Sequence, residues 1–337
     1  MSGQASPRVD RRSARRPGRW RRLSDWFVAV LVISGGKLVC RLPEGPLWRL
    51  GNLAGTLEYL VAPSRRDHAR RNLRRIVKWM ATSATGAEEY RRAAADPKAL
   101  EALVRSAFRH HAHYYLELAR APRFDAGYVA ERLLVETPDD VDRWLTERRA
   151  LIVLGLHFGA IELPGFYAVS RLGPIVAPME TIRNARVQRY LFKTRATIGV
   201  HIVTLEEAGR ELLAALRRNE PVGLIADRDI TGAGLDVELF GAATTIPAGP
   251  AFLASETGAP AYMSTVRRDG PGRYRGRLRL VPAPEGANRR ERGRAMARQE
   301  ARMFEQFIAE APEQWLALFH PIWPDLEPPK PAHGARA

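Results

Sequence analysis

The stretch LIVLGLHFGAIELPG, residues 151–165, decides the fold that this sequence predicts. It opens as a continuous apolar run, which is typical of a strand buried on both faces of a parallel sheet. The run stops at His157, Gly159 permits a tight turn, and a helix is predicted to start near residue 161. Because ligands of open α/β sheets bind beyond the carboxyl ends of the strands, we expect His157 at the mouth of a cleft.

Short apolar strands and helices continue to alternate toward the C-terminus. Beyond the strand at 150–156, the pattern predicts strands at 174–177, 201–204 and 221–226, and helices at 161–172, 184–198, 205–219, 248–257 and 288–310. Two longer strands, 260–268 and 273–281, flank DGPG and predict an antiparallel hairpin. The predicted fold class is α/β, with a largely parallel central sheet flanked by helices.

Composition divides the chain into four segments. Residues 1–22 predict a disordered basic arm, and residues 326–337 a disordered tail. Residues 23–63 are apolar, are interrupted by GG and PEGP, and predict amphipathic helices that face a membrane interface rather than a span. A buried N-terminal helix behind a solvated arginine tail is the alternative. Residues 64–325 then hold the α/β domain.

The net charge of +16 is concentrated in two places. Residues 1–25 hold eight Arg against two Asp, and the predicted helix at 64–78 holds seven Lys or Arg against one Asp. Such clusters point to a polyanionic partner: anionic lipid, nucleic acid or a phosphate-bearing substrate. The Trp- and Val-rich sequence after the basic arm favours lipid. Nucleic acid is disfavoured because residues 64–76 hold no aromatic side chain for base stacking.

A single cysteine rules out an internal disulfide and a cysteine-based zinc site, and it fits a reducing compartment. The stretch RHHAHYYLE (109–117) places His110, His113 and Glu117 at helical spacing, but no second such motif completes a two-metal site. We therefore predict no metal and expect a solvated or membrane-facing helix surface there. No Walker loop or GxSxG elbow is present, so a serine nucleophile is unsupported.

Three histidines have an acid five residues later: His157 with Glu162, His201 with Glu206, and His320 with Asp325. Context separates them, because only His157 ends a strongly apolar strand and precedes a helix. A carboxylate bound to one ring nitrogen fixes the tautomer and leaves the other nitrogen as a general base, and we expect Glu162 to supply it. The alternative is that His157 caps a helix or is a satisfied core residue.

A second strand, within PVGLIADRDITGAG (221–234), ends in Asp227, Arg228 and Asp229. If both strands lie in one parallel sheet, His157 and Asp227 converge at its edge, and Arg228 can bind phosphate. A solvated acid–base–acid turn is the alternative. Farther on, Thr245 and Gly249 precede a small-residue helix whose N–H groups can hold an anion, although many structural turns look the same.

Together these motifs resemble a family of bacterial membrane acyltransferases that includes the lipid A late acyltransferases and the phosphatidylinositol mannoside acyltransferases. The resemblance runs from about residue 64 to 324 and rests on HFGAIE as the H-x4-[D/E] motif, with RRNLRRIV, AFRHHAHYYLELAR and APEQWLALFHPIW. The segment from LIADRD to PAGPA looks most similar to the mannoside branch. That branch often has Glu where this chain has Asp227, and Asp where it has Glu162.

The resemblance implies transfer of a fatty acyl group from acyl-CoA to a sugar hydroxyl of a glycolipid, with no cofactor and no metal. His157 is then the base and Glu162 its orienting carboxylate, while backbone N–H groups hold the oxyanion. Asp227 supports the positive imidazole or positions the acceptor. The implied substrate-binding residues are Arg228, Asp229, Gly159, Thr245 and Gly249. The implied location is peripheral, on the cytoplasmic face of the inner membrane, with an anionic lipid surface as partner. A lipid A acceptor, an acyl carrier protein donor and a non-catalytic membrane scaffold stay open, as do acyl chain length and oligomeric state.

Overall fold

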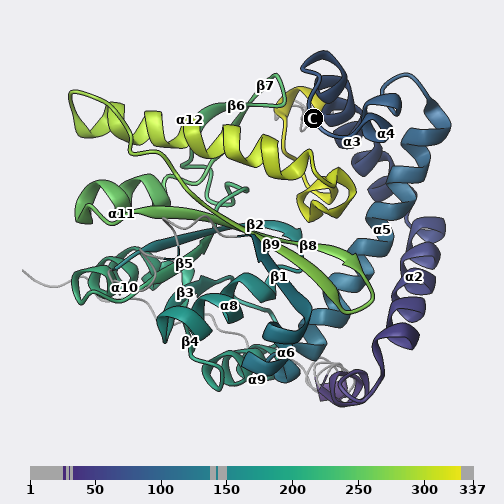
Figure 1. The fold of residues 1–337 in the computed structure, drawn as a ribbon, viewed down its shortest axis with the longest axis horizontal. Coiled ribbons are helices and arrows are strands. Elements are labelled where there is room, and N and C mark those ends of the chain that lie inside the picture. The colour runs from purple at the N-terminus through teal and green to yellow at the C-terminus, as the bar shows by residue number, and fades with distance from the viewer. Residues whose placement is uncertain (1–25, 28–29, 31–32, 137–141, 143–149, 328–337) are drawn as a thin grey trace, which may run out of the picture.

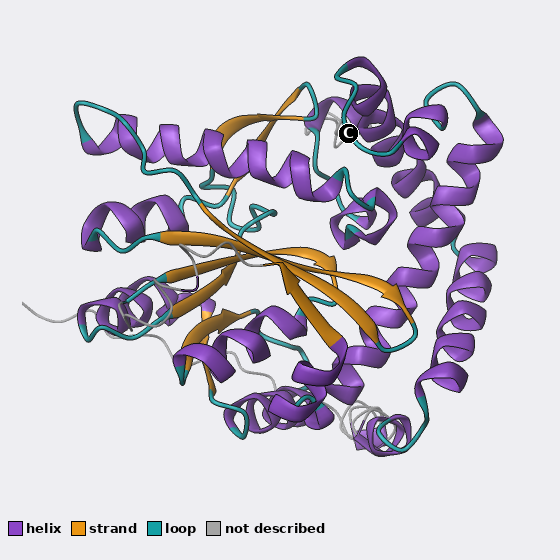
Figure 2. Ribbon diagram, viewed as in Figure 1, coloured by secondary structure: helices purple, strands orange, loops and turns teal. Residues whose placement is uncertain are grey.

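The computed structural model describes residues 26–27, 30, 33–136, 142 and 150–327. Its centre is a seven-stranded sheet in the order β1-β9-β8-β2-β5-β3-β4 (Figures 1 and 2). The strands are β1 (Leu133–Glu136), β2 (Ile152–Gly159), β3 (Ile175–Met179), β4 (Val200–Thr204), β5 (Val222–Ile225), β8 (Ala261–Gly270) and β9 (Arg273–Leu280). Every neighbouring pair in this sheet is parallel except the β8–β9 hairpin. The predicted parallel sheet and the predicted hairpin are both confirmed.

Helices cover both faces of the sheet (Figure 1). One face carries α10 (Leu205–Arg217), α11 (Gly249–Thr257) and α12 (Arg289–Ile308); the other carries α6 (Ala126–Arg132), α8 (Glu162–Leu172) and α9 (Ala185–Ala196). The bounds of α8, α9, α10, α11 and α12 agree with the predicted helices to within a few residues, whereas α6 was not predicted. Apolar periodicity was therefore sufficient to locate the strand–helix units around the site.

Side chains of β2 alternate between the two faces. Ile152, Leu154 and Phe158 join the core beneath α11 and α12, whereas Leu151 and Val153 join the core beneath α8. The alternation explains the continuous apolar run, because a strand covered by helices on both sides has no solvent face. The same alternation directs the side chains at odd-numbered positions of β2 toward the α8 side of the sheet.

A helical layer stands at one end of the sheet (Figure 1). It consists of α2 (Glu44–Val61), α3 (Pro63–Thr82), α4 (Glu88–Arg92) and α5 (Pro97–Arg120), followed by the short η1 (Ala121–Arg123). Helix α2 packs closely on α5 because Gly51 and Gly55 lack side chains; an added Cβ would lie 2.4 Å from ring atoms of His113 or from Cα of Arg109. Within the predicted interface segment, one helix ends before PEGP (residues 43–46) and the next, α2, begins at Glu44.

The predicted break at Gly35-Gly36 is wrong. Residues 33–39 are helical throughout. An added Cβ on Gly36 would lie 3.3 Å from the carbonyl oxygen of Ala119, so the glycine lets this helix approach the end of α5 instead of ending it.

The arginines of α3 mostly serve internal contacts. Arg65 pairs with Glu58 of α2, Arg70 with Glu101 of α5, and Arg75 with Asp325. Among the described residues, only two basic residues of this helix are exposed and without such a partner: Arg74 and Lys78. The cluster therefore ties three parts of the chain together and is less of a free polyanion surface than its composition suggests.

Two smaller parts complete the fold. Strands β6 (Leu235–Leu239) and β7 (Ala242–Ile246) form a separate antiparallel pair, and β7 lies where the sequence predicted only a turn before a helix. The C-terminal segment, residues 311–323, contains η2 (Pro312–Gln314) and η3 (Leu316–Phe319), and η4 (Pro324–Leu326) follows it. Asn72 of α3 holds this segment by donating from Nδ2 to the carbonyl oxygens of Leu318 and His320.

The predicted basic arm, residues 1–22, and nearly all of the predicted tail lie outside the described residues. Within the described part of the chain, no helix combines the length and the apolar character needed to cross a bilayer.

Candidate active site

His157 and Asp227 meet at the carboxyl edge of the parallel strands. Nδ1 of His157 lies 2.7 Å from Oδ1 of Asp227, and the side chain of Asp227 is fully buried while that of His157 is 30% exposed. An ionised carboxylate can only accept, so the ring carries its proton on Nδ1 and leaves Nε2 free. This is the geometry in which a buried acid orients a histidine whose other nitrogen takes up a proton.

Two further donors hold the same carboxylate. The backbone N–H of His157 donates to Oδ2 of Asp227 over 3.0 Å, and the indole N–H of Trp315 donates to that oxygen over 2.7 Å. Burial alone opposes ionisation, but the charge of His157 and these hydrogen bonds outweigh it and lower the pKa of Asp227. Asp227 is therefore a carboxylate at neutral pH.

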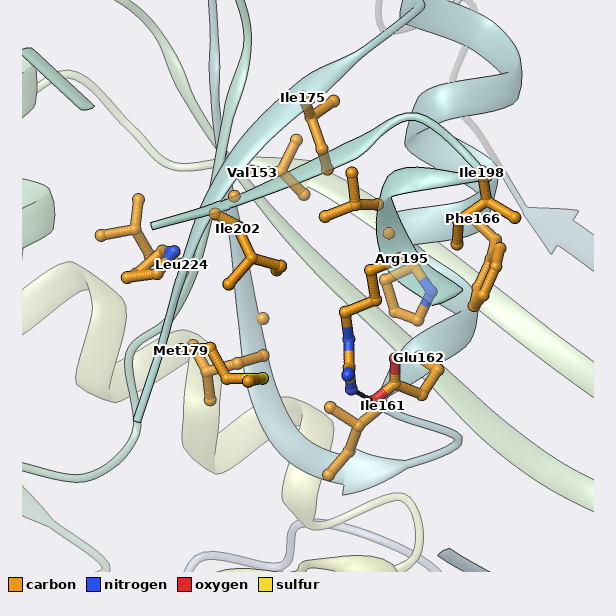
Figure 3. Close-up of a pocket in the computed structure, with 18 of the residues that line it drawn as sticks. Val153, Ile161, Glu162, Phe166, Ile175, Met179, Arg195, Ile198, Ile202 and Leu224 are labelled. Carbon is orange, nitrogen blue, oxygen red and sulfur yellow. Dashed lines mark hydrogen bonds and ion pairs between the residues drawn. The ribbon is translucent and has the colours of Figure 1, made fainter. Parts of the chain in front are cut away.

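Glu162 does not occupy the place expected for it. It opens α8, and its Oε1 accepts from Nη2 of Arg195 on α9 over 2.5 Å, with both side chains 12% exposed (Figure 3). The expected hydrogen bond from Glu162 to the ring of His157 is thus replaced by Asp227. The reason is strand geometry: Asp227 follows the strand directly beside β2, whereas Glu162 lies past a turn and points toward α9.

The turn after His157 depends on Gly159. This residue has φ +57°, and an added Cβ would lie 2.0 Å from the carbonyl oxygen of Val266, so only glycine fits. Its own carbonyl accepts from Nη2 of Arg268, which is fully buried and paired with Glu117 of α5. Gly159 therefore shapes the turn through its backbone.

Backbone N–H groups of this turn are already used. Those of Ala160 and Ile161 donate to the carbonyl oxygens of Val266 and Gly159. They are not free for the oxyanion that the sequence assigned to nearby backbone donors. Side chains facing the cleft are the better candidates for that task.

His157 opens onto a cleft of ≈ 520 Å³. Its walls come from α5, the residues after β3, α9, the loop after β5 and the C-terminal segment. Besides His157, the polar members of the lining are His111, Tyr114, Tyr115, Glu180, Arg195, Arg228 and His320. Arg228 makes no hydrogen bond or ion pair with any described residue, so its guanidinium is available for an anion beside the base.

The other predicted binding residues do not line this cleft. Asp229 accepts from the backbone N–H groups of Thr231, Gly232 and Gly234, and Thr245 of β7 donates to it over 3.3 Å. The Asp229–Thr245 contact therefore fixes the loop that carries Arg228. Gly249 opens α11, and an added Cβ there would meet Leu224 at 3.8 Å.

An apolar pocket of ≈ 210 Å³ adjoins the cleft on the α8 side of the sheet. Tyr114, Met179, Ile225 and Arg195 border both spaces. Figure 3 shows its wall of aliphatic side chains and the Glu162–Arg195 pair at one side. Small residues of the strands leave room for it: Gly155 on β2, Ala177 on β3 and Gly223 on β5.

His320 is the main site residue that sequence reasoning missed. Its context in a proline-containing stretch set it aside, yet the C-terminal segment returns across the sheet edge and places its ring in the cleft. Desolvation, with the nearby charges of Arg228 and His157, lowers the pKa of His320 to about 4, so the ring is neutral at physiological pH. The sequence signal that could have identified His320 as a site residue was its place in FHPIW, part of a stretch that resembles the family.

The histidines of α5 form no metal site. His113 stacks on Trp48 of α2 and hydrogen-bonds Asn52, half-buried His110 makes an edge contact with Trp48, and Glu117 pairs with Arg268. The expectation of a solvated or membrane-facing surface is wrong for these residues, because α2 covers them. Among the described residues, no three potential ligands gather closely enough to hold a metal ion.

Comparison with known proteins places this site in a family. The model of the bacterial lipid A biosynthesis acyltransferase family matches residues 16–324, and the chain belongs to that family. It is 34% identical over 164 residues to a phosphatidylinositol mannoside acyltransferase of Mycolicibacterium smegmatis, covering 48% of this chain and 54% of that protein. Its identity to a phosphatidylinositol mannoside acyltransferase of Mycobacterium tuberculosis is 30% over 155 residues, covering 44% and 49%. The chain spans about half the length of these curated relatives. The resemblance drawn from HFGAIE is confirmed.

Proposed function

We propose that this protein transfers a fatty acyl group from acyl-CoA to a sugar hydroxyl of a glycolipid such as a phosphatidylinositol mannoside, with His157 as general base. The observation that carries the proposal is the His157–Asp227 pair, which leaves Nε2 facing a cleft beside an apolar pocket. Membership of an acyltransferase family supports it.

The proposed reaction needs no covalent acyl-enzyme. Nε2 of His157 removes the proton of the acceptor hydroxyl as its oxygen attacks the thioester carbonyl carbon, and Asp227 stabilises the imidazolium. The tetrahedral intermediate collapses with cleavage of the C–S bond, and the imidazolium returns its proton to the departing thiolate. A new ester and a free thiol result, and His157 is again neutral.

The apolar pocket and the charged residues around the cleft each have a role in the proposed reaction. The apolar pocket takes the acyl chain, since burying methylene groups there is favourable by about 0.8 kcal/mol each. Arg228 takes the oxyanion or a phosphate of the donor or of the lipid headgroup, because it is a cation beside the base that makes no hydrogen bond or ion pair with any described residue. Glu162 acts through Arg195, which borders both spaces.

Association with a membrane surface is part of the proposal. Helix α2 presents a stripe of exposed apolar side chains on the face opposite its contact with α5: Leu50, Leu53, Leu57, Leu60 and Val61. A helix with an unpartnered apolar face of this kind lies in the interface of a bilayer. The lipid acceptor would then be reached from the cytoplasmic face of the inner membrane.

The test is thiol release from palmitoyl-CoA by the wild type and by His157→Ala, with two acceptor panels. One panel holds mannosylated inositol lipids, and the other holds acyl-deficient lipid A precursors. We expect release that depends on the mannosylated acceptor and falls by several orders of magnitude in the variant. Release with the lipid A panel alone would favour the alternative function of a lipid A acyltransferase, in line with the family description. No release with either panel, although the protein binds vesicles, would favour a non-catalytic scaffold.

A further inference from the structure

Trp315 reaches the candidate base pair from the far end of the chain. We propose that Trp315 is a positioning residue, whose indole N–H and the backbone N–H of His157 together hold one oxygen of Asp227 so that the other faces Nδ1 of His157. The inference deepens the proposed function and rests on it for its catalytic meaning.

The hydrogen bonds leave the carboxylate one orientation. Oδ2 of Asp227 accepts from Nε1 of Trp315 and from the backbone N–H of His157, at 2.7 and 3.0 Å, while Oδ1 accepts from the ring at 2.7 Å. No part of the Asp227 side chain is exposed, so water cannot replace a lost donor. Rotation of the carboxylate would leave a buried anion unpaired, which is strongly unfavourable.

Trp315 is itself fixed in place. It is fully buried, and its backbone bridges that of Phe158, the residue after His157. Its ring lies 6.2 Å from that of Trp323 and 6.4 Å from that of Phe240, in edge or tilted contacts. The same residue therefore anchors the strand end that carries the base and the acid that orients it.

The indole N–H of Trp315 also affects how strongly Asp227 holds the proton on the ring of His157. A hydrogen bond from the indole spreads the charge of the Asp227 carboxylate and lowers its pull on the imidazolium proton. Without that donor the carboxylate, still buried and still bonded to His157, attracts the proton more strongly. His157 would then stay protonated to a higher pH and be a less available base near neutrality.

The chain offers a matched control for this test. Trp323 is as deeply buried in the same aromatic cluster, but its indole N–H donates to the carbonyl oxygen of Leu239 over 2.9 Å. Trp315→Phe and Trp323→Phe each remove one buried hydrogen bond from one ring. Only the first removes a donor to Asp227, so a difference between the two variants isolates that contact.

The first readout is the pH titration of the His157 ring by NMR of histidine-labelled protein, assigned with His157→Gln. The midpoint should rise by about half to one pH unit in Trp315→Phe and stay at the wild-type value in Trp323→Phe. The other titratable and charged groups of the cleft stay unchanged in both variants: His111, Tyr114, Tyr115, Glu180, Arg195, Arg228 and His320. Glu162, which pairs with Arg195, is unchanged as well. A midpoint that is unmoved or lower in Trp315→Phe would overturn the proposal.

A second readout needs no substitution at Trp315. In the wild type, one indole N–H resonance should follow the His157 titration, because its acceptor is the carboxylate that pairs with the ring. If no indole resonance does so, the proposal fails even when Trp315→Phe does not fold. Neither titration needs substrate, so normal shifts without acyl transfer would contradict the proposed function and leave this inference standing.

Kinetics then connect the contact to turnover. Trp315→Phe should lower kcat about tenfold and move the acid limb of the pH–rate profile to higher pH. In an Asp227→Asn background, the same substitution should cost nothing further, since Trp315 acts only through that carboxylate. Additive losses in the double variant would contradict a positioning role.

Discussion

Two carboxylates lie near His157, and only one of them touches it. Asp227 is bonded to the ring and is held ionised by its surroundings, whereas Glu162 neutralises Arg195. A carboxylate on the ring stabilises the imidazolium that forms when a hydroxyl loses its proton. In the proposed reaction Glu162 would act through Arg195, which borders both the cleft and the apolar pocket.

Substitution of the two acids should separate these roles. Asp227→Asn should lower kcat by about three orders of magnitude, because an amide can force the wrong ring tautomer and cannot stabilise the imidazolium. The remaining activity should persist to lower pH, since the imidazolium has lost its counter-charge. Glu162→Gln should cost only about tenfold and leave the pH profile in place, because its amide oxygen still accepts from Arg195.

Steady-state kcat measured from pH 5 to 9 on both variants checks this. Circular dichroism and a denaturant midpoint show that each variant is folded. If Glu162→Gln were the more damaging of the two, the assignment of Asp227 as the orienting acid would be wrong.

The sequence could identify His157 and its edge of the sheet but not the partner of its ring. Both acids were candidates from the sequence, but the pairing of β5 with β2 brings Asp227 to the ring. Glu162 instead pairs with Arg195, 33 residues away in the chain, and no motif linked these two residues. His320 was missed for the same reason, because its place in the cleft follows from the path of the C-terminal segment. Spacing along a chain gives no information about contacts between distant elements.

Among the secondary-structure elements, α2 has two different faces: one packs on α5 and the other is exposed to solvent. Its inner face is built for close contact, with Gly51 and Gly55 against α5. Its outer face repeats exposed leucines every three or four residues, and Leu53, Leu57 and Leu60 are each more than half exposed. Removing those leucines should therefore change surface binding without changing the fold.

The triple variant Leu53→Ser, Leu57→Ser, Leu60→Ser should lose most of its binding to anionic vesicles in a flotation assay. About 2 kcal/mol of insertion energy disappears with each leucine. A matched control is the triple variant Leu134→Ser, Leu205→Ser, Leu280→Ser, which alters exposed leucines on β1, α10 and β9. Equal loss in both variants, or loss in neither, would contradict an interfacial role for α2.

Helix α3 shows where composition misleads. Its seven basic residues suggested a surface for polyanions, but the acids that neutralise Arg65, Arg70 and Arg75 come from α2, α5 and the residues after the C-terminal segment. A count of charges cannot anticipate partners that arrive from distant elements. The first basic cluster, residues 1–25, lies outside the described residues.

For the molecule as a whole, buried carboxylic acids should contribute to how stability depends on pH, and Glu300 is the one with the largest upward pKa shift among those of the described residues. Glu300 of α12 is fully buried, and neither of its oxygens has a hydrogen-bond partner among the described residues. Desolvation raises its pKa from 4.5 to about 8, so the folded protein keeps a proton that the unfolded chain releases. The folded state binds more protons over this range, and stability therefore falls as pH rises from about 4.5 to about 8.

Glu300→Gln removes that titration at nearly constant volume. We expect similar free energies of unfolding for the variant and the wild type at pH 5, and a more stable variant at pH 8, by up to roughly 4 kcal/mol. Urea unfolding at pH 5, 6, 7 and 8 measures the difference. Glu285→Gln, at an exposed position, should follow the wild-type curve. Parallel curves for Glu300→Gln and the wild type would contradict this account.

The overall architecture was largely predictable because each strand–helix unit carries its own periodic pattern. The order of the strands was not, since pairing β9 with β1 at one edge and β2 between β5 and β8 depends on packing between distant segments. The β6–β7 pair was also only partly visible, because AATTI resembles a loop as much as a strand. Local pattern therefore specified the elements, and tertiary packing specified the site.

The bond from Asn72 to Leu318 joins residues that are 246 positions apart. During synthesis, the helices of the first third leave the ribosome long before the segment with Trp315 and His320 exists. A growing chain can therefore present α2 to a surface while its catalytic edge is still incomplete. If the proposed function holds, acyl transfer must wait until nearly all of the polypeptide has emerged and folded, and a product truncated before Trp315 should show no acyl transfer.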